Sequence, residues 1–145
     1  MQLVEHDAEV HALVGAAVVG AGVGQVHGLD GEEPLAMVSR LAVEKTLACD
    51  RAAVIIGADT AVVQGGAVFG KPENAEDAVS MLTTLSGTVH QVMTGVAVRR
   101  GDDVQTAVSV TDVHFRSIGA DEALRYWNTG EPADKAGAYA VQGLG

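Results

Sequence analysis

The sequence predicts an α/β fold, because patterns typical of strands and patterns typical of helices share one chain. Residues 52–56 form a short apolar run rich in β-branched side chains, which is typical of a strand buried on both faces. Residues 34–49 carry apolar side chains at steps of three and four, with Pro34 at the first position, which indicates an amphipathic helix. Residues 88–100 and 104–115 are β-rich runs separated by a short polar turn, which predicts an antiparallel hairpin.

Turn and cap residues mark further elements. Gly65 and Gly66 stand between two apolar pairs and predict a second hairpin. Asn74 is a good N-cap, Asp77 completes a capping box, and Gly87 is suited to end the helix between them. The remaining expectations are a helical pattern in residues 1–13, a strand within residues 14–23, a short helix at residues 120–127 and a loop at residues 130–135.

Length and charge limit the classes of function. The 145 residues suit a single domain, and an apolar content of 48% argues against disorder. The net charge of −10, with no basic cluster beyond Arg99 and Arg100, would repel a nucleic acid, so we expect no nucleic-acid partner. A small phosphorylated ligand is compatible with this charge, because a few lysines are enough to make a local positive pocket.

Cysteine usage and hydropathy bear on location. Cys49 is the single cysteine and cannot form an internal disulfide, so a reducing cytoplasm fits, with the thiol as a small buried hydrophobe. The apolar run over residues 12–23 is too short and too rich in glycine to span a membrane, and we expect no membrane partner. His90 and His114 are too far apart for a recognisable zinc pattern, and we interpret both as structural.

The candidate site follows the buried run of residues 52–56. The run stops at Gly57, and Asp59 and Thr60 are the next side chains that can do chemistry. A carboxylate just beyond a buried strand stands where open α/β sheets bind their ligands. The hairpin around Gly65 and Gly66 would bring Lys71 back towards Asp59. One acid and one base would then face a common cleft, which is the least that a metal-assisted phosphate site requires.

Each of these residues also has a plainer interpretation. An Asp after a strand is often a turn residue whose side chain bonds nearby amides. Lys71 taken alone is typical of a solvated surface charge, and Lys45 of an exposed helix lysine. Arg40 and Glu44 are four residues apart on the predicted helix and are expected to pair on its surface.

Several short motifs together resemble one family, the Maf-type nucleoside triphosphate pyrophosphatases. The similarity covers residues 30–145, and each block alone is weak whereas their common order is specific. The blocks are Arg40-Leu41-Ala42 with Lys45, Gly57-Ala58-Asp59-Thr60, Gly70-Lys71-Pro72 with Leu85-Ser86-Gly87, and Asp134-Lys135-Ala136-Gly137 through Gln142-Gly143, with His90 and Thr94-Gly95-Val96 also in place.

The resemblance implies an elongated mixed β-sheet flanked by helices, with a nucleotide-binding cleft. It also implies cleavage of a nucleoside triphosphate between the α and β phosphates, with Mg²⁺ or Mn²⁺, and suggests a homodimer. By resemblance, Asp59 is the catalytic proton acceptor or metal-binding carboxylate, and Lys45 and Lys71 bind phosphate oxygens. Thr60 and Gln142 stand where the family sorts bases, and this pair resembles the subgroup that acts on dTTP and UTP.

Two departures from the family pattern lead to a second hypothesis. The family's Ser/Arg-Arg segment and its C-terminal segment have no counterpart in these 145 residues, so we expect a chain truncated at both ends. Gly24 and Gln25 stand where the family has Asp-Glu, and Glu32 and Glu33 are the nearest substitutes. The alternative is therefore a non-catalytic nucleotide-binding or interaction protein.

Overall fold

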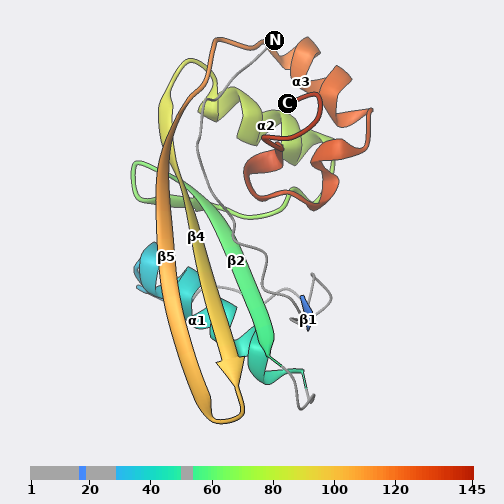
Figure 1. The fold of residues 1–145 in the computed structure, drawn as a ribbon. Coiled ribbons are helices and arrows are strands. Elements are labelled where there is room, and N and C mark those ends of the chain that lie inside the picture. The colour runs from blue at the N-terminus through green and yellow to red at the C-terminus, as the bar shows by residue number, and fades with distance from the viewer. Residues whose placement is uncertain (1–16, 19–28, 50–53) are drawn as a thin grey trace. The chain divides into compact units, whose positions relative to one another are not determined.

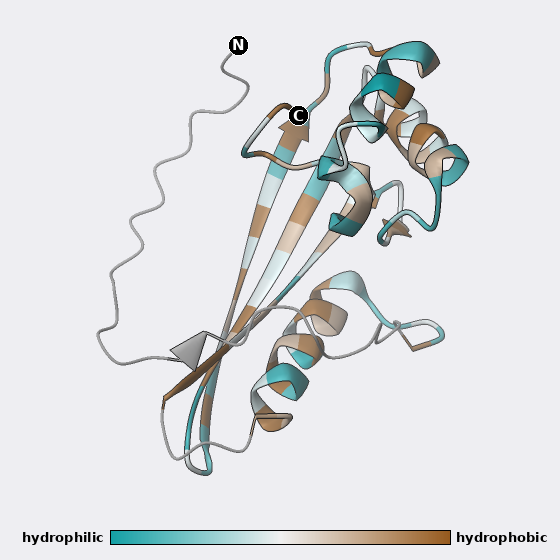
Figure 2. Ribbon diagram, turned by 90° about the vertical axis from the view of Figure 1, so that its right-hand side faces the viewer, coloured by the Kyte–Doolittle hydropathy of each residue, from teal (hydrophilic) through white to brown (hydrophobic). Residues whose placement is uncertain are grey.

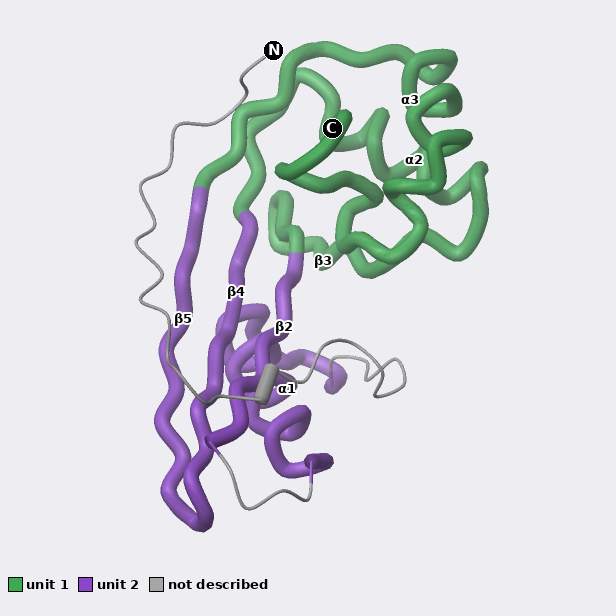
Figure 3. The backbone as a smooth tube through the Cα atoms, turned by 45° about the vertical axis from the view of Figure 1, so that its right-hand side comes forward, with its two compact units in different colours: residues 1–12, 62–91, 112–145 green, residues 13–61, 92–111 purple. Residues whose placement is uncertain are grey.

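The computed structural model describes residues 17–18, 29–49 and 54–145, which fall into two compact units (Figure 3). Of the described residues, unit 1 holds 62–91 and 112–145, and unit 2 holds 17–18, 29–49, 54–61 and 92–111. Each unit is described by itself below. The prediction of a single domain over residues 1–145 stays a prediction.

Within the described residues five strands form one mixed sheet, so the predicted α/β class is confirmed (Figure 1). The strand order is β1-β2-β4-β5, with β3 paired to β2; β1 is parallel to β2, and β3 is antiparallel to it. The strands are β1 (Ala17–Val18), β2 (Ile55–Gln64), β3 (Ala67–Phe69), β4 (Val89–Arg100) and β5 (Asp103–His114). The helices are α1 (Pro34–Leu47), α2 (Ala75–Leu85) and α3 (Ala120–Trp127), followed by the 3₁₀ turns η1 (Glu131–Asp134) and η2 (Ala136–Ala138).

In unit 2, helix α1 approaches the strands to backbone contact. A Cβ atom built at Gly57 on β2 would lie 2.3 Å from the carbonyl oxygen of Ala42, and one at Gly95 on β4 would lie 2.3 Å from that of Val38. Both distances are far below van der Waals contact, so only glycine fits at these two positions. The buried face of α1 consists of Met37, Val38, Leu41, Ala42 and Thr46.

In unit 1, the predicted hairpin and the predicted cap of α2 are both confirmed. Gly65 and Gly66 have φ angles of 57° and 86°, as a two-residue hairpin turn requires, and Gln64 pairs with Ala67 across it. The side chain of Asn74 accepts a hydrogen bond from the Asp77 amide at 3.0 Å. These two elements were predictable because the turn and the cap are specified by adjacent residues.

Helices α2 and α3 pack against each other to form the core of unit 1 (Figure 1). Helix α2 also packs against η2, and α3 against η1. Leu82 and Leu85 of α2 and Ala123 of α3 are buried. Buried and more exposed residues alternate along β4, so this strand turns one face to a core. Figure 2 shows hydrophobic and hydrophilic bands along the strands by colour.

A buried aromatic cluster fixes the segment after η1 in unit 1. The Nε2 atom of His90 lies 2.7 Å from the Tyr139 hydroxyl, and the two rings meet edge-on with Phe115 beside them. His90 is buried, in keeping with the structural role predicted for it, whereas His114 is exposed. Just before Tyr139, the fully buried Ala138 has a left-handed φ of 60°.

The structure corrects two expectations. The strand at residues 52–56 does not stop at Gly57: β2 begins at Ile55 and continues through Asp59 and Thr60, because Gly57 makes room for α1 and does not end the strand. The loop predicted at residues 130–135 contains the 3₁₀ turn η1, with Pro132 in its first turn.

Other expectations fall partly outside the described residues. The helical pattern of residues 1–13 lies wholly outside them, as do residues 52–53. Of the strand expected within residues 14–23, the described part is β1. No helix within the described residues combines the length and the apolar character needed to cross a membrane.

The contact at Gly57 predicts a large loss of stability on adding one methyl group. Gly57→Ala would force the backbones of β2 and α1 apart, and we expect the free energy of unfolding to fall by about 3 kcal/mol. Gly70→Ala is the matched control, because a Cβ at Gly70 meets nothing within 4 Å. Urea unfolding measures both variants. Equal stabilities would show that α1 does not pack so closely on β2.

The burial of His90 predicts a loss of stability on acidification. Burial holds the pKa of His90 below its ordinary value of 6.5, so the unfolded chain binds a proton at a higher pH than the folded chain does. The free energy of unfolding should therefore fall as the pH is lowered from about 7 to about 5. His90→Gln should lack this component and His114→Gln should keep it, in urea unfolding at each pH.

Candidate functional site

An ion pair between α1 and β2 is the centre of the candidate site in unit 2. Lys45 lies in the last turn of α1, and its Nζ atom is 2.6 Å from Oδ1 of Asp59 and 2.8 Å from the carbonyl oxygen of Ala58. Both side chains are 20% exposed. The pair follows from the packing, because α1 touches β2 at Gly57, two residues before Asp59.

This geometry decides between the interpretations of Lys45 and Asp59. Asp59 lies inside β2 and its side chain pairs with Lys45, so the interpretation of Asp59 as a turn residue is wrong. Lys45 is not a freely solvated helix lysine either. The sequence motifs predicted both residues as site residues, and the structure brings these two together.

Thr60 is the next residue on β2, and its hydroxyl oxygen lies 2.9 Å from that of Thr94 on β4. Either hydroxyl can donate in this contact. The sequence analysis named Thr60 as a site residue, and Thr94 only as part of a family motif. Two neighbouring hydroxyl groups, each able to donate and to accept a hydrogen bond, therefore lie together in unit 2, one next to Asp59 in the sequence and the other on β4.

Asp59 offers the type of ligand that a divalent cation needs. Its Oδ1 atom is engaged by Lys45, and among the described residues no hydrogen-bond partner is found for Oδ2. No group of three or more His, Cys, Asp or Glu side chains gathers within the ranges that the structure describes. Mg²⁺ is commonly held by one or two carboxylates together with water and substrate phosphates, so the donor set fits an ion shared with a phosphate ligand.

Glu32, one of the two substitutes named for the family's Asp-Glu pair, is already engaged. Glu32 accepts two hydrogen bonds from Arg40, each 2.7 Å long, and these bonds lower its pKa to about 2. Arg40 also donates to Glu44 at 2.8 Å, which confirms the pair predicted on α1. The pairing with Glu32 was missed because the two residues are eight positions apart, beyond helical spacing. Gly24 and Gln25 themselves lie outside the described residues.

Lys71 and Gln142 belong to unit 1, and both are exposed. Lys71 follows Gly70, whose carbonyl oxygen accepts a hydrogen bond from the Gly137 amide at 2.9 Å. This bond ties the end of the β3 hairpin to the segment that leads to Gln142. Because Asp59 lies in unit 2, the convergence of Lys71 with Asp59 stays a prediction.

The sequence as a whole is similar to known proteins. The family model described as "Maf-like protein" matches residues 10–145. A "dTTP/UTP pyrophosphatase" of Saccharophagus degradans is 49% identical over 122 residues, which cover 79% of this chain and 58% of that protein. Proteins of the same name are 52% identical in Anaeromyxobacter dehalogenans (81% and 62% covered) and 54% identical in Methylococcus capsulatus (64% and 46% covered). The chain thus spans about half to two thirds of the length of the curated relatives it matches.

The Lys45–Asp59 pair predicts an energetic coupling between the two positions. We expect Lys45→Met and Asp59→Asn to be non-additive by about 1 kcal/mol in the free energy of unfolding, since both side chains are largely shielded from solvent. A double-mutant cycle measured by urea unfolding gives this coupling. A value near zero would show that the ion pair does not persist in solution.

Proposed function

Because the chain belongs to the Maf-like family, we propose that it hydrolyses dTTP and UTP to the nucleoside monophosphate and pyrophosphate. The observation that carries this proposal is the Lys45–Asp59 pair, which sets an acid and an amine side by side at the end of α1. The names of the similar proteins supply the substrate class.

The proposed chemistry is attack of water on the α phosphorus. Asp59 accepts the proton of the attacking water, the bond from the α phosphorus to the bridging oxygen breaks, and pyrophosphate leaves. Lys45 and Lys71 bind phosphate oxygens and offset the negative charge that builds on them in the transition state. A divalent cation, Mg²⁺ or Mn²⁺, held by Asp59 would supply further charge stabilisation as a Lewis acid.

An arriving triphosphate gives Lys45 a second acceptor. In the structure Lys45 bonds Oδ1 of Asp59 directly, so this carboxylate oxygen is already occupied. Transfer of the Lys45 amine to a phosphate oxygen would release Asp59. In this proposal substrate binding therefore prepares the base.

Base selection is assigned to Thr60 and Gln142. A hydroxyl and a carboxamide can each donate and accept a hydrogen bond, which suits the imide edge of thymine and uracil. The contact between Thr60 and Thr94 supports this role, because it restricts the directions in which the Thr60 hydroxyl can point. A cytoplasmic location and a homodimeric state complete the proposal and rest on the single cysteine and on the family resemblance.

The proposal predicts release of pyrophosphate from dTTP and UTP in the presence of Mg²⁺ or Mn²⁺. Asp59→Asn keeps the shape of the side chain but removes its basicity, and should lower kcat by at least about 100-fold. Pyrophosphate release measured with a coupled assay tests this. Glu76→Gln, on the exposed first turn of α2, is the control and should match the parent chain.

Calorimetry with dTTP distinguishes the alternative. Binding without turnover in the parent chain would favour a non-catalytic nucleotide-binding protein. Turnover that survives Asp59→Asn undiminished would exclude Asp59 as the proton acceptor.

A further inference from the structure

The carboxylate of Glu131 in unit 1 is enclosed by the backbone of the segment that carries Gln142. Its oxygens accept hydrogen bonds from the Leu144 amide at 3.0 and 3.2 Å and from the Gly145 amide at 3.2 Å. These bonds help to hold the pKa of Glu131 below its ordinary value, an effect in which the bond from the Tyr126 hydroxyl is the largest cause. The carboxylate is therefore charged at neutral pH and binds the segment from one side.

Two glycines make this enclosure possible. A Cβ atom at Gly143 would lie 2.3 Å from Oε2 of Glu131, and Gly143 has a φ of 122° that other residues rarely adopt. A Cβ at Gly145 would lie 2.5 Å from the Tyr126 hydroxyl oxygen. A side chain at either position would require the segment, or the Glu131 and Tyr126 groups that bond it, to shift.

Tyr126 of α3 connects the two ends of the same segment. Its hydroxyl donates to Oε1 of Glu131 at 2.6 Å and accepts from the Ala140 amide at 3.1 Å. Burial, followed by the bond to Glu131, raises the pKa of Tyr126 to about 12, so the hydroxyl keeps the proton that it donates. Residues 140 and 144–145 are thus tied to one pair of side chains, and Gln142 lies between the two attachment points.

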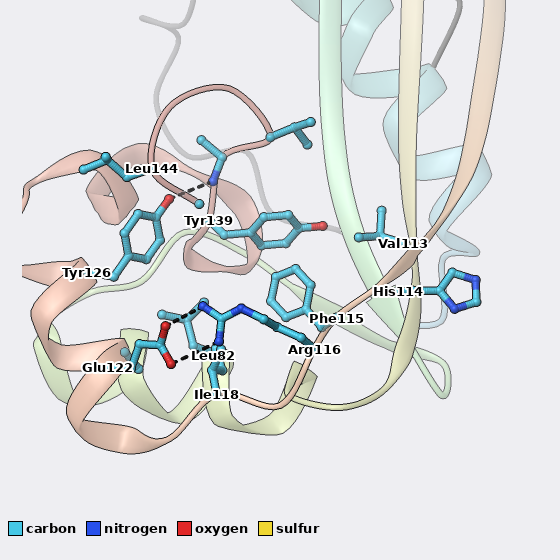
Figure 4. Close-up of a pocket in the computed structure, with 14 residues that line it drawn as sticks. Leu82, Val113, His114, Phe115, Arg116, Ile118, Glu122, Tyr126, Tyr139 and Leu144 are labelled. Carbon is cyan, nitrogen blue, oxygen red and sulfur yellow. Dashed lines mark hydrogen bonds and ion pairs between the residues drawn. The ribbon is translucent and has the colours of Figure 1, made fainter. Parts of the chain in front are cut away.

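Side chains near Tyr126 line a pocket in unit 1. Figure 4 shows Tyr126 and Tyr139 lining a pocket of about 130 Å³, with the hydrogen bond of Tyr126 drawn to the backbone. Leu144 and Val141, on either side of Gln142, line the same pocket. Val141 and Leu144 stay 60% and 74% exposed, so the segment is held mainly by the hydrogen bonds at residues 140 and 144–145.

We propose that Glu131 and Tyr126 are positioning residues that hold the segment of residues 140–145 in one conformation and so set the base preference conferred by Gln142. The inference rests on the proposed function for the role of Gln142, and on the contacts above for the anchoring itself. Neither residue needs to touch the nucleotide. Loosening the segment should weaken recognition of the base and leave recognition of the phosphates intact.

The test compares Glu131→Gln and Tyr126→Phe with the parent chain on dTTP and dATP. Each variant removes one hydrogen-bonding function and keeps the shape of its side chain. We expect the ratio of kcat/KM for dTTP to that for dATP to fall about tenfold. The inhibition constant of tripolyphosphate, which carries phosphates but no base, should change by less than about twofold. A general loss of structure would also weaken inhibition by tripolyphosphate, and that result would overturn the proposal.

Glu122→Gln is the matched control, because Glu122 lies on the same helix as Tyr126 but pairs with Arg116 (Figure 4). It should keep the selectivity of the parent chain. Hydrogen exchange of the peptide that covers residues 140–145 provides a readout independent of catalysis. Faster exchange in Glu131→Gln and Tyr126→Phe, but not in Glu122→Gln, supports the anchoring, and unchanged exchange overturns it.

The two proposals fail in distinguishable ways. If the parent chain hydrolyses no nucleotide, the proposed function fails and the role in base selection fails with it, while hydrogen exchange still decides the anchoring. If the parent chain hydrolyses dTTP and the two variants keep its selectivity, the function stands and the inference about Glu131 and Tyr126 is wrong.

Discussion

The contact of α1 with β2 and β4 through Gly57 and Gly95 is the constraint on which unit 2 depends. At both points a helix carbonyl occupies the space that a Cβ atom would fill. This sets the distance and the rotation of the helix together, because two separate contacts fix a rod more firmly than one. Lys45 reaches Asp59 because of the position of α1. The geometry of the site therefore depends on close packing at two glycines, Gly57 and Gly95.

In unit 1 the comparable role falls to polar side chains. His90 bonds Tyr139, and Glu131 with Tyr126 holds the end of the described chain. Backbone amides that would otherwise need water are satisfied by these side chains, which lets a segment without regular secondary structure keep one path. Two ways of placing functional groups thus coexist: close backbone packing in one unit and side-chain hydrogen bonds in the other.

The elements predicted correctly from the sequence are those specified by neighbouring residues. The hairpin at Gly65 and Gly66 and the cap at Asn74 are read from a few adjacent positions. The end of β2 was misjudged because a glycine that makes room for a helix looks, in sequence, the same as one that breaks a strand. The bonds from Arg40 to Glu32 and from Tyr126 to Glu131 join residues whose spacing indicates no pairing, so only the folded chain reveals them. Gly143 and Gly145, on one side of Gln142, were the available hint of a tightly wrapped segment.

The backbone at Ala138 has a consequence for engineering the chain. A left-handed alanine is less favourable than a left-handed glycine by about 1 kcal/mol, and this residue is fully buried. The alanine methyl group is buried in the core, so the favourable packing of this group opposes the cost of the backbone conformation. Ala138→Gly would ease the backbone and remove the packing of one methyl group, whereas a β-branched residue would be unfavourable in both respects.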